Sequence, residues 1–388
     1  MDMIHRQMSK EDVGTHGMEH GPTALLTVDL AAIGENYRLL RSLGQGRECG
    51  AVVKANAYGL GVETVAPYLA RQGCSTFFVA TLAEGVQLRR LVARAKIYLL
   101  NGLPTGPLAL FREYGLSPVL NSLAMLKRWL EISGATGDFP PAALHLDTGM
   151  NRLGIGSDEW EELQNELPHI CESGAIDLVM SHLACADEPD HPHNRKQLTL
   201  FRDKAKILPS LPRSLCNSAG IFLGSDYHFD LLRPGIALYG GQPIIGRKNP
   251  MRPVVHLETR IAQIRMVPKG DGIGYGAAYQ TRRKTRLATL PVGYADGYHR
   301  ALGCTDKRKG ASAFIGDFEA PLLGRVSMDL ITIDITDIPP AQARTGTRVE
   351  LLGTHVTIDD LATKAGTIGY EILTSLGTRY DVRHVGAE

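Results

Sequence analysis

Residues Gly50 to Gly61 hold the side chains whose types and spacing are best suited to chemistry. The stretch reads Gly-Ala-Val-Val-Lys-Ala-Asn-Ala-Tyr-Gly-Leu-Gly, so a Val-rich run ends in one lysine, Lys54, and small residues follow it. This pattern is typical of a buried strand that opens into a loop. A partly desolvated amine at such a strand end has a lowered pKa and acts as a nucleophile towards aldehydes or a base towards carbon acids. A surface lysine after a strand is the alternative, and Lys54 alone does not exclude it.

Composition describes a soluble globular protein of about two domains. The 388 residues are 44% hydrophobic and 21% charged, with a formal net charge of +1. A chain of this length exceeds one ordinary core. It carries no basic stripe interleaved with aromatic residues, so we expect no nucleic-acid partner. It also carries no run apolar enough to cross a bilayer, so we expect no membrane partner.

The cysteines and the N-terminal residues point to a cytoplasmic protein without a metal site. Six cysteines lie far apart and include no Cys-x-x-Cys pair, which indicates buried free thiols in a reducing compartment. Residues 1–22 have no sustained apolar block and are predicted to be a disordered extension. Their three histidines lack the regular spacing of metal ligands, so we expect no metal. The cysteines are Cys49, Cys74, Cys171, Cys185, Cys216 and Cys304.

From residue 50 to about residue 235, short runs rich in Val, Ile and Leu alternate with amphipathic segments. The amphipathic segments carry apolar residues at three- and four-residue spacings, as helices packed on a sheet do. About eight such units in roughly 200 residues fit a closed (β/α)₈ barrel of parallel strands better than an open sheet. The predicted strands are Gly50–Ala55, Thr76–Ala80, Lys96–Leu100, Ser117–Asn121, Ala142–Asp147, Asp177–Leu183, Ser214–Ser218 and Phe229–Arg233. The predicted helices are Ala31–Leu43 (after a strand at Ala24–Leu30), Gly61–Gln72, Ser122–Ile132, Ser157–Leu167 with Ser157 as N-cap and Asp158 and Glu159 in its first turn, and Asn194–Leu208.

The alternation stops near Tyr239, and long β-rich stretches separated by Gly, Asp and Pro turns follow. Only Thr357–Ala365 has the pattern of a helix, with Thr357 as N-cap and Asp360 three residues later. We therefore predict an α/β chain with a disordered extension at 1–22, a (β/α)₈ barrel at 23–247 and a mainly antiparallel β domain at 248–388. The β-rich stretches are Val254–Val267, Thr285–Tyr294, Ala313–Val326, Leu330–Ile335 and Thr347–Leu352.

Polar residues follow the ends of several predicted barrel strands, and these ends meet at one mouth in a barrel. The turns after the last two strands are where barrels commonly bind phosphate through backbone N–H groups. Each such residue taken singly is more often part of a simple turn. Together with a strand-end lysine they favour a phosphorylated aldehyde cofactor, and pyridoxal phosphate in particular. The residues are Lys54 and Tyr58, Asp147 to Arg152, His182, Asn217 and Ser218, and Arg233, Pro234, Gly235 and Ile236.

The stretch Ala51 to Gly61 resembles the cofactor signature of alanine racemases, and five further segments resemble that family in the same order. The resemblance spans about residues 23 to 383. It implies an isomerase that interconverts L-alanine and D-alanine with pyridoxal 5'-phosphate and supplies D-alanine for peptidoglycan. The further segments are Asp147-Thr-Gly-Met-Asn-Arg-Leu-Gly154, Leu232-Arg-Pro-Gly-Ile-Ala-Leu-Tyr-Gly240, Gly274-Tyr-Gly276, Pro291-Val-Gly-Tyr-Ala-Asp-Gly297 and Gly324-Arg-Val-Ser-Met-Asp329.

The resemblance also implies the roles of individual residues. Lys54 would hold the cofactor covalently and act as the base on one face of the substrate carbon, and Tyr275 would be the base on the other face. Two bases facing each other across a planar carbon suit racemisation, which removes a proton on one side and delivers one on the other. In the family Tyr275 and Met328 come from the partner subunit, so a head-to-tail homodimer with shared sites is implied.

The remaining implied roles concern the cofactor ring and its phosphate. Arg233 would donate to the pyridine nitrogen, because an arginine stays protonated, and this makes the ring a weaker electron sink than an aspartate partner would. His182 would support Arg233. Arg152 would lie near the phenolic oxygen and the substrate carboxylate, and the backbone N–H of Met328 would contact substrate. The phosphate contacts would be Tyr58, Ser218, Gly235 and Ile236, with Asn217 beside them.

Two departures from the family pattern leave parts of the site open. Many members have a lysine, often carbamylated, where this chain has His145. A neutral histidine accepts one hydrogen bond from Arg152 but cannot neutralise it, so we expect Asn151 or a bound anion such as chloride to complete the site. The last phosphate contact of some members falls at Thr378, with Tyr380 as the nearby substitute.

Two other readings remain beside alanine racemisation. One is a different enzyme on this scaffold, either a racemase of broader amino-acid specificity or a decarboxylase, of which Arg233 at the pyridine position disfavours the decarboxylase. The other is a non-catalytic pyridoxal phosphate carrier, which would explain Lys54 and the phosphate turn but leaves the second domain and Tyr275 without a purpose.

Overall fold

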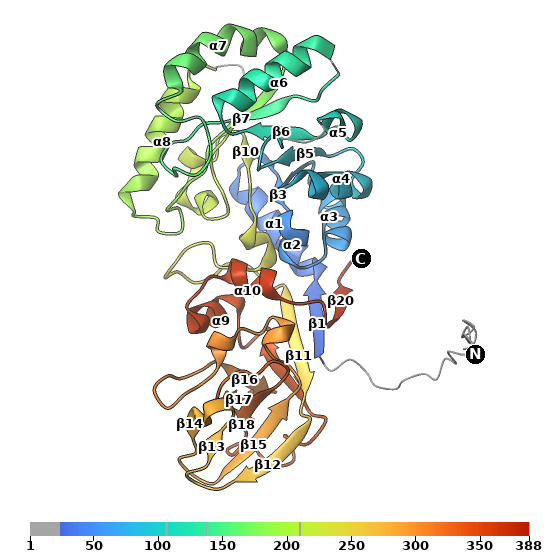
Figure 1. Cartoon of the computed structure of the whole chain (residues 1–388), viewed down its shortest axis with the longest axis vertical. Helices are drawn as coiled ribbons and strands as arrows, with labels where there is room; N and C mark the ends of the chain where they lie inside the picture. The colour runs from blue at the N-terminus through green and yellow to red at the C-terminus, as the bar shows by residue number, and fades with distance from the viewer. Residues whose placement is uncertain (1–23, 105–107, 137, 209–210, 388) are drawn as a thin grey trace, which may run out of the picture.

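The barrel and the second domain lie end to end along the long axis of the molecule (Figure 1). The structure, a computed structural model, describes residues 24–104, 108–136, 138–208 and 211–387. The predicted extension at 1–22 lies outside the described residues. Among the helices of the described segments, none is long and apolar enough to span a membrane.

Eight parallel strand positions form the barrel, which confirms the predicted fold class. Seven strands pair in the order β3-β4-β5-β6-β7-β8-β9, and β10 pairs with β2, which continues into β3. The ring is closed by the N–H of Asp230, which donates to Arg213 O at 2.9 Å, and by that of Gly50, which donates to Leu232 O at 2.9 Å. The strands are β2 (Glu48–Cys49), β3 (Ala51–Val52), β4 (Thr76–Val79), β5 (Lys96–Leu99), β6 (Ser117–Leu120), β7 (Ala142–His145), β8 (Ile176–Met180), β9 (Arg213–Ser214) and β10 (Leu231–Leu232).

Helices cover the outside of the barrel, as Figure 1 shows. Continuous apolar runs form the strands because both of their faces are buried, one by helices and one by the barrel interior. The helices are α1 (Leu30–Leu43), α2 (Lys54–Tyr58), α3 (Val62–Arg71), α4 (Leu82–Leu91), α5 (Ala109–Glu113), α6 (Leu123–Thr136), α7 (Trp160–Ser173) and α8 (Pro192–Ala205). Three 3₁₀ turns, η1 (Gly220–Leu223), η2 (Ser225–Tyr227) and η3 (Ile236–Tyr239), follow the last two strands.

The predicted start of α7 is wrong. The helix begins at Trp160 with Glu159 as N-cap, and its acidic first-turn residues are Glu161 and Glu162. The carboxylate of Glu159 instead accepts the N–H of Leu123 at 3.1 Å, at the start of α6. The Glu159 side chain is therefore bound to the start of another helix, α6.

The second domain contains two antiparallel layers and one strand from the start of the chain. A six-stranded sheet has the order β17-β16-β19-β11-β1-β20, and a three-stranded sheet has the order β12-β15-β18. Strand β1 (Ala24–Asp29) pairs antiparallel with β11 and parallel with β20, so the first strand joins the second domain's sheet. The other strands are β11 (Val255–Arg260), β12 (Gln263–Val267), β13 (Gly272–Ile273), β14 (Tyr279–Gln280), β15 (Thr285–Leu290), β16 (Ser312–Ile315), β17 (Phe318–Pro321), β18 (Ile331–Asp334), β19 (Arg348–Leu352) and β20 (Asp381–Val385).

Short helical turns complete this domain. Helix α9 (Ile358–Ala365) begins with the predicted capping box of Thr357 and Asp360. Helix α10 (Gly369–Ser375) follows it and was not predicted. The 3₁₀ turns are η4 (Tyr275–Ala277), η5 (Tyr294–Asp296) and η6 (Arg300–Leu302).

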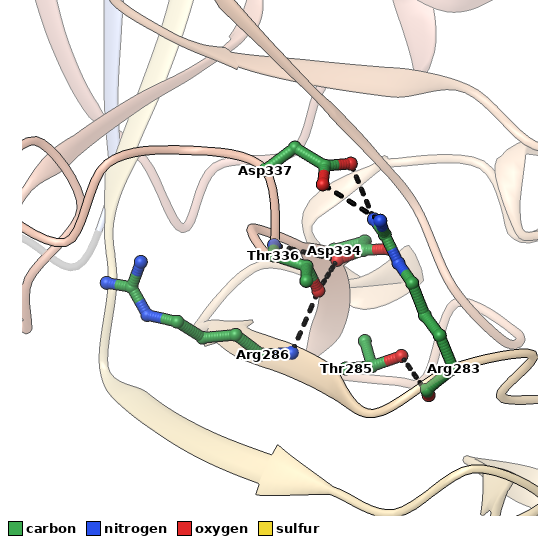
Figure 2. A network of polar contacts seen from close by, with 6 residues as sticks. All are labelled: Arg283, Thr285, Arg286, Asp334, Thr336 and Asp337. Atoms are coloured by element: carbon green, nitrogen blue, oxygen red, sulfur yellow. Dashed lines mark hydrogen bonds and ion pairs between the residues drawn. The ribbon is translucent and has the colours of Figure 1, made fainter.

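A polar network fastens the turn after β18 to the start of β15 (Figure 2). Arg283 donates to both carboxylate oxygens of Asp337, at 2.8 and 2.5 Å. Thr336 Oγ1 accepts the N–H of Arg286 at 2.9 Å, and Asp334 accepts the N–H of Thr336 at 2.8 Å. The network lies on the surface, and it fixes the turn relative to the three-stranded sheet.

Candidate active site

One cavity of about 500 Å³ opens at the carboxyl ends of the barrel strands. It brings together all nine residues that the sequence predicted around a cofactor, although they come from five separate strand ends. Apolar side chains of Val52, Leu100, Val119 and Met180 form part of its wall. The nine residues are Lys54, Tyr58, Arg152, His182, Asn217, Ser218, Arg233, Gly235 and Ile236.

A left-handed turn made of residues other than glycine follows Lys54. Ala55, Asn56, Ala57 and Tyr58 have φ angles of 51°, 55°, 54° and 57°. This conformation costs roughly 1–2 kcal/mol for each L-residue, less for asparagine. Hydrogen bonds hold it, including Ala57 N–H to Val53 O at 2.9 Å and Gly59 N–H to Ala55 O at 2.8 Å. Burial first, and then the positive charge of Arg152, lowers the pKa of the Lys54 amine, which favours its neutral, basic form.

Tyr58, Ser218 and Gly235 form a narrow polar cradle at one end of the cavity. A Cβ at Gly235 would lie 2.2 Å from the Tyr58 hydroxyl oxygen, so only glycine fits there. Ser218 Oγ accepts the N–H of Gly235 at 2.8 Å and that of Ala237 at 3.2 Å. Because these bonds occupy its lone pairs, the Ser218 hydroxyl is left to donate its own proton. Burial raises the pKa of Tyr58, so its hydroxyl also remains a donor.

Arg233 is buried, with 3% of its surface exposed, and hydrogen bonds within the protein fix its guanidinium. Nη2 donates to Ser181 O at 2.5 Å and to Leu215 O at 3.4 Å, and Nη1 donates to Ser214 Oγ. Burial lowers the pKa of Arg233 to about 10, which still leaves it protonated at neutral pH. The structure therefore presents a fixed cationic donor in the cavity, and the residues that hold it were not singled out from the sequence.

Two histidines, the buried His145 and the partly buried His182, lie in the cavity beside the arginines. Burial, together with the charges of Arg233 and Arg152, lowers the pKa of His182 well below its usual range. Burial and Arg233 lower the pKa of His145 to about 4. Both rings are therefore neutral at pH 7.

The tautomer of His145 follows from Asn121, a residue that the sequence analysis did not assign. Asn121 Nδ2 donates to Leu100 O at 2.9 Å, so its Oδ1 is the atom that faces His145 Nδ1 at 2.7 Å. His145 must then carry its proton on Nδ1, which leaves Nε2 as an acceptor. Asn151, the predicted alternative partner of Arg152, is not among the described residues that line the cavity.

The loop that carries Arg152 is shaped by Asp147. The carboxylate of Asp147 accepts the N–H groups of Gly149 at 2.9 Å, Met150 at 3.0 Å and Asn151 at 3.1 Å. Three backbone donors on one carboxylate fix the path of the loop, and they bring Arg152 to the cavity.

Tyr275 and Met328 lie outside this cavity, in the second domain. Tyr275 sits in η4, between β13 and β14. These two strands lie at the end of the molecule away from the barrel helices α6 and α7 (Figure 1). Its side chain is 71% exposed and that of Met328 is 54% exposed. Two further exposed apolar side chains, Tyr294 and Leu330, lie on the neighbouring loops. We call Tyr275, Tyr294, Met328 and Leu330 the loop face.

Backbone contacts order the loops of the loop face. The N–H groups of Tyr294 and Ala295 donate to Ser327 O and Met328 O, both at 3.0 Å. Arg379 joins the same two loops, because it contacts Asp296 at 3.1 Å and Asp329 at 2.8 Å. The exposed side chains are therefore carried on fixed backbone.

Tyr370 also lines the cavity and was missed by the sequence analysis. It lies in α10, and its ring centroid is 5.9 Å from that of Tyr58. Thr378 and Tyr380, the positions left open as a last phosphate contact, are not among the described residues that line the cavity. The only sign of Tyr370 in the sequence would have been the Tyr-Glu pair near the start of a short segment with a helical pattern.

Comparisons with known proteins agree with this geometry. Residues 28–243 match the family described as alanine racemase, N-terminal domain, and residues 254–384 match alanine racemase, C-terminal domain. The chain belongs to the alanine racemase family. The family, the fold class and the enzyme class predicted from the sequence are thereby confirmed.

Relatives in this family include alanine racemases described as catabolic and others described as biosynthetic. The chain is 48% identical to the catabolic alanine racemase of Mesorhizobium japonicum over 99% of both chains. It is 43% identical to the biosynthetic alanine racemase of Agrobacterium fabrum over 97% of both chains. The crystal structure of the Bartonella henselae alanine racemase, with covalently bound pyridoxal phosphate, matches with a TM-score of 0.89 and 40% identity, covering 94% of this chain and 100% of that one.

Proposed function

We propose that this protein racemises alanine with pyridoxal 5'-phosphate held covalently on Lys54, through a two-base mechanism. The observation that carries the proposal is the single cavity in which a strand-end amine, a buried guanidinium and a glycine-walled polar cradle converge. When bound, pyridoxal phosphate supplies the electron sink that makes the Cα–H bond of an amino acid acidic. Every other part of the reaction falls to the protein's own side chains.

The donor set of the cavity fits this cofactor. At the cradle, the hydroxyls of Tyr58 and Ser218 would donate to phosphate, with Gly235 and Ile236 at the start of η3 and Asn217 beside them. Arg233 would donate to the pyridine nitrogen from its fixed position, and the neutral ring of His182 would lie near it without adding charge. A donor that stays protonated to about pH 10 keeps that nitrogen unprotonated, which favours racemisation over transamination.

Lys54 would take or deliver the proton on one face of the substrate carbon. Its lowered pKa makes the neutral amine more available as a base. Arg152 would orient the substrate carboxylate. With His145 neutral and its Nε2 an acceptor, one hydrogen bond donated by Arg152 would still leave that charge unbalanced, so we propose that a bound anion such as chloride lies beside Arg152.

Tyr275 would be the base on the opposite face, contributed by a second copy of the chain. The loop face supports this assignment, because four large apolar side chains on ordered loops are exposed together. A head-to-tail homodimer would place Tyr275 and the backbone N–H of Met328 of each copy over the other copy's barrel mouth. The dimer is then required for catalysis.

We further propose a cytoplasmic enzyme that supplies D-alanine for peptidoglycan. The described thiols support a reducing compartment, since Cys49, Cys74, Cys216 and Cys304 are buried and free, and Cys185 is free. Growth without added D-alanine of a bacterial strain that lacks its own alanine racemases, after expression of this protein, tests the biosynthetic role.

The enzymatic proposal is tested by D-amino acid formation from a panel of L-amino acids, with added pyridoxal phosphate. Turnover largely confined to alanine, abolished in Lys54→Ala and strongly reduced in Tyr275→Phe, is the expected result. Comparable turnover of Ser, Lys or Arg would move the assignment to a broad-specificity racemase. A visible cofactor band without turnover of any amino acid would replace the proposal by a carrier function.

A further inference from the structure

Glu84 makes more hydrogen bonds than its place in a helix cap requires. It is the third residue of α4, where it exchanges hydrogen bonds with Thr81 in a capping box, at 3.3 and 3.1 Å. The same carboxylate also accepts the N–H of Ala80 at 2.7 Å through Oε2. Through Oε1 it accepts the N–H of Ala55 at 2.7 Å, which lies 29 residues away and follows the neighbouring barrel strand. One carboxylate thus joins the ends of β3 and β4.

Ala55 is the first residue of the left-handed turn that follows Lys54. Four consecutive residues with positive φ and a Cβ persist only where their surroundings fix them. On the strand side, Val53 N–H donates to Phe78 O at 2.9 Å. On the turn side, the Ala55 N–H donates to a carboxylate, which makes a charge-assisted and therefore strong bond. The backbone of Lys54 lies between these two anchors.

We propose that Glu84 is a positioning residue for Lys54. By holding the Ala55 N–H at the end of β4, it keeps the turn left-handed and the Lys54 amine directed into the cavity. Glu84 is not among the described residues that line the cavity, so we assign it no contact with cofactor or substrate. Its carboxylate charge also raises the pKa of the Lys54 amine, against the larger lowering by burial and by Arg152, and hydrogen exchange of the turn reports the backbone effect separately from this charge effect. The inference rests on the proposed role of Lys54 for its catalytic consequence, but its structural part stands on the hydrogen bonds alone.

The substitution Glu84→Gln distinguishes the positioning of Lys54 by Glu84 from the part that Glu84 plays in the cap of α4. Glutamine has the same shape but only one accepting oxygen, whereas both oxygens of Glu84 accept backbone N–H groups. The amide NH₂ must therefore face either Ala55 N–H or the two donors at Ala80 and Thr81. Helix α9 offers the matched control, because Asp360 forms the same box with Thr357, at 2.9 and 3.1 Å. The control variant is Asp360→Asn.

The experiment compares wild type, Glu84→Gln and Asp360→Asn as holoenzymes. Hydrogen exchange of the peptide covering residues 51–60 and the kcat and KM for L-alanine are measured on each. We expect Glu84→Gln to exchange faster in this peptide and to lose about 10- to 100-fold in kcat with little change in KM, because small misplacements of a reacting group cost this much. Asp360→Asn should match wild type in both measurements.

Two outcomes would overturn the proposal. One is a Glu84→Gln protein with wild-type exchange in residues 51–60, and the other is an equal loss of kcat in Asp360→Asn. A wild-type protein without racemase activity would refute the proposed function instead, and the exchange measurement would still decide the role of Glu84.

Discussion

The barrel mouth and the loop face hold the chemically important side chains in opposite ways. At the barrel mouth, Arg233 is 3% exposed, and its Nη1 and Nη2 atoms donate to hydroxyl and backbone acceptors. On the loop face, backbone hydrogen bonds join the loops of Tyr294 and Met328, but Tyr275 is 71% exposed. The barrel mouth is a preorganised pocket, whereas the loop face exposes its side chains to solvent.

This difference shows which half of the site a single chain can complete. Binding and orienting a phosphorylated cofactor needs buried, satisfied polar groups, which a single chain supplies from its barrel and from Tyr370 of α10. An exposed tyrosine lacks the desolvated surroundings of a catalytic base, and a second copy's barrel mouth would supply them. The following predictions test this division, beginning with the largest expected effect.

Mixing an inactive variant with a strongly impaired one should restore activity if the site is shared. Lys54→Ala and Tyr275→Phe each damage both sites of their own homodimer. A mixed dimer has one site with both substitutions and one site with neither, so random pairing should recover about a quarter of wild-type activity. The measurement is racemase activity after unfolding and refolding the two proteins together. Activity that stays at the level of the separate variants would mean that both groups act within one chain.

Gly235→Ala should weaken the cofactor cradle without touching the loop face. The new methyl would meet the Tyr58 hydroxyl at 2.2 Å and displace it. Losing one hydrogen bond to a charged phosphate corresponds to about 10- to 100-fold weaker pyridoxal phosphate binding, which equilibrium dialysis measures.

Gly134→Ala is the control for Gly235→Ala, because a Cβ at Gly134 in α6 meets nothing within 4 Å. It should bind cofactor as wild type does. Unchanged binding in Gly235→Ala would show that Tyr58 does not contribute to the cradle.

The two domains should also respond to acid with opposite signs. The pKa of His145 is about 4 in the folded protein, below its ordinary value of 6.5. Between these values the unfolded chain binds a proton that the folded protein does not, so stability falls as the pH drops from 6.5 to 4, by up to about 3 kcal/mol. In the second domain, hydrogen bonding to Glu350 and the nearby Asp317 raise the pKa of His355. The raised pKa of His355 therefore stabilises the folded protein below pH 6.5. This stabilisation is lost as the pH rises through the pKa that His355 has in the folded protein.

Urea unfolding from pH 4 to 8 at one protein concentration measures both effects. His145→Gln should flatten the loss of stability in acid, and His355→Gln should steepen it slightly, since His355 is partly exposed and screened. A steeper acid loss in His145→Gln would contradict the neutral assignment of that ring.

The barrel and most of its mouth could be predicted from the sequence because their signals are local. Doubly buried strands read as short apolar runs, and the residue after each run marks the mouth. The features that were missed depend on distant partners. Tyr370 reaches the cavity from α10, Asn121 matters through its bond to His145, and α7 starts late because Glu159 binds Leu123. The left-handed turn was hidden because Ala55 and Ala57 give no sign of a positive φ.

The smallest effect is expected at the surface network of Figure 2. Arg283 is exposed. Its ion pair with Asp337 costs both groups part of their hydration and gains only an attraction that the solvent screens. Arg283→Ala should therefore leave Tm, kcat and cofactor binding without resolvable change, as thermal unfolding and steady-state assays would show. The backbone bonds between η5 and the Met328 loop, rather than surface ion pairs, then order the loop face. A clear loss of kcat with unchanged cofactor binding would instead mean that this network also positions Tyr275, eight residues before Arg283 in the chain.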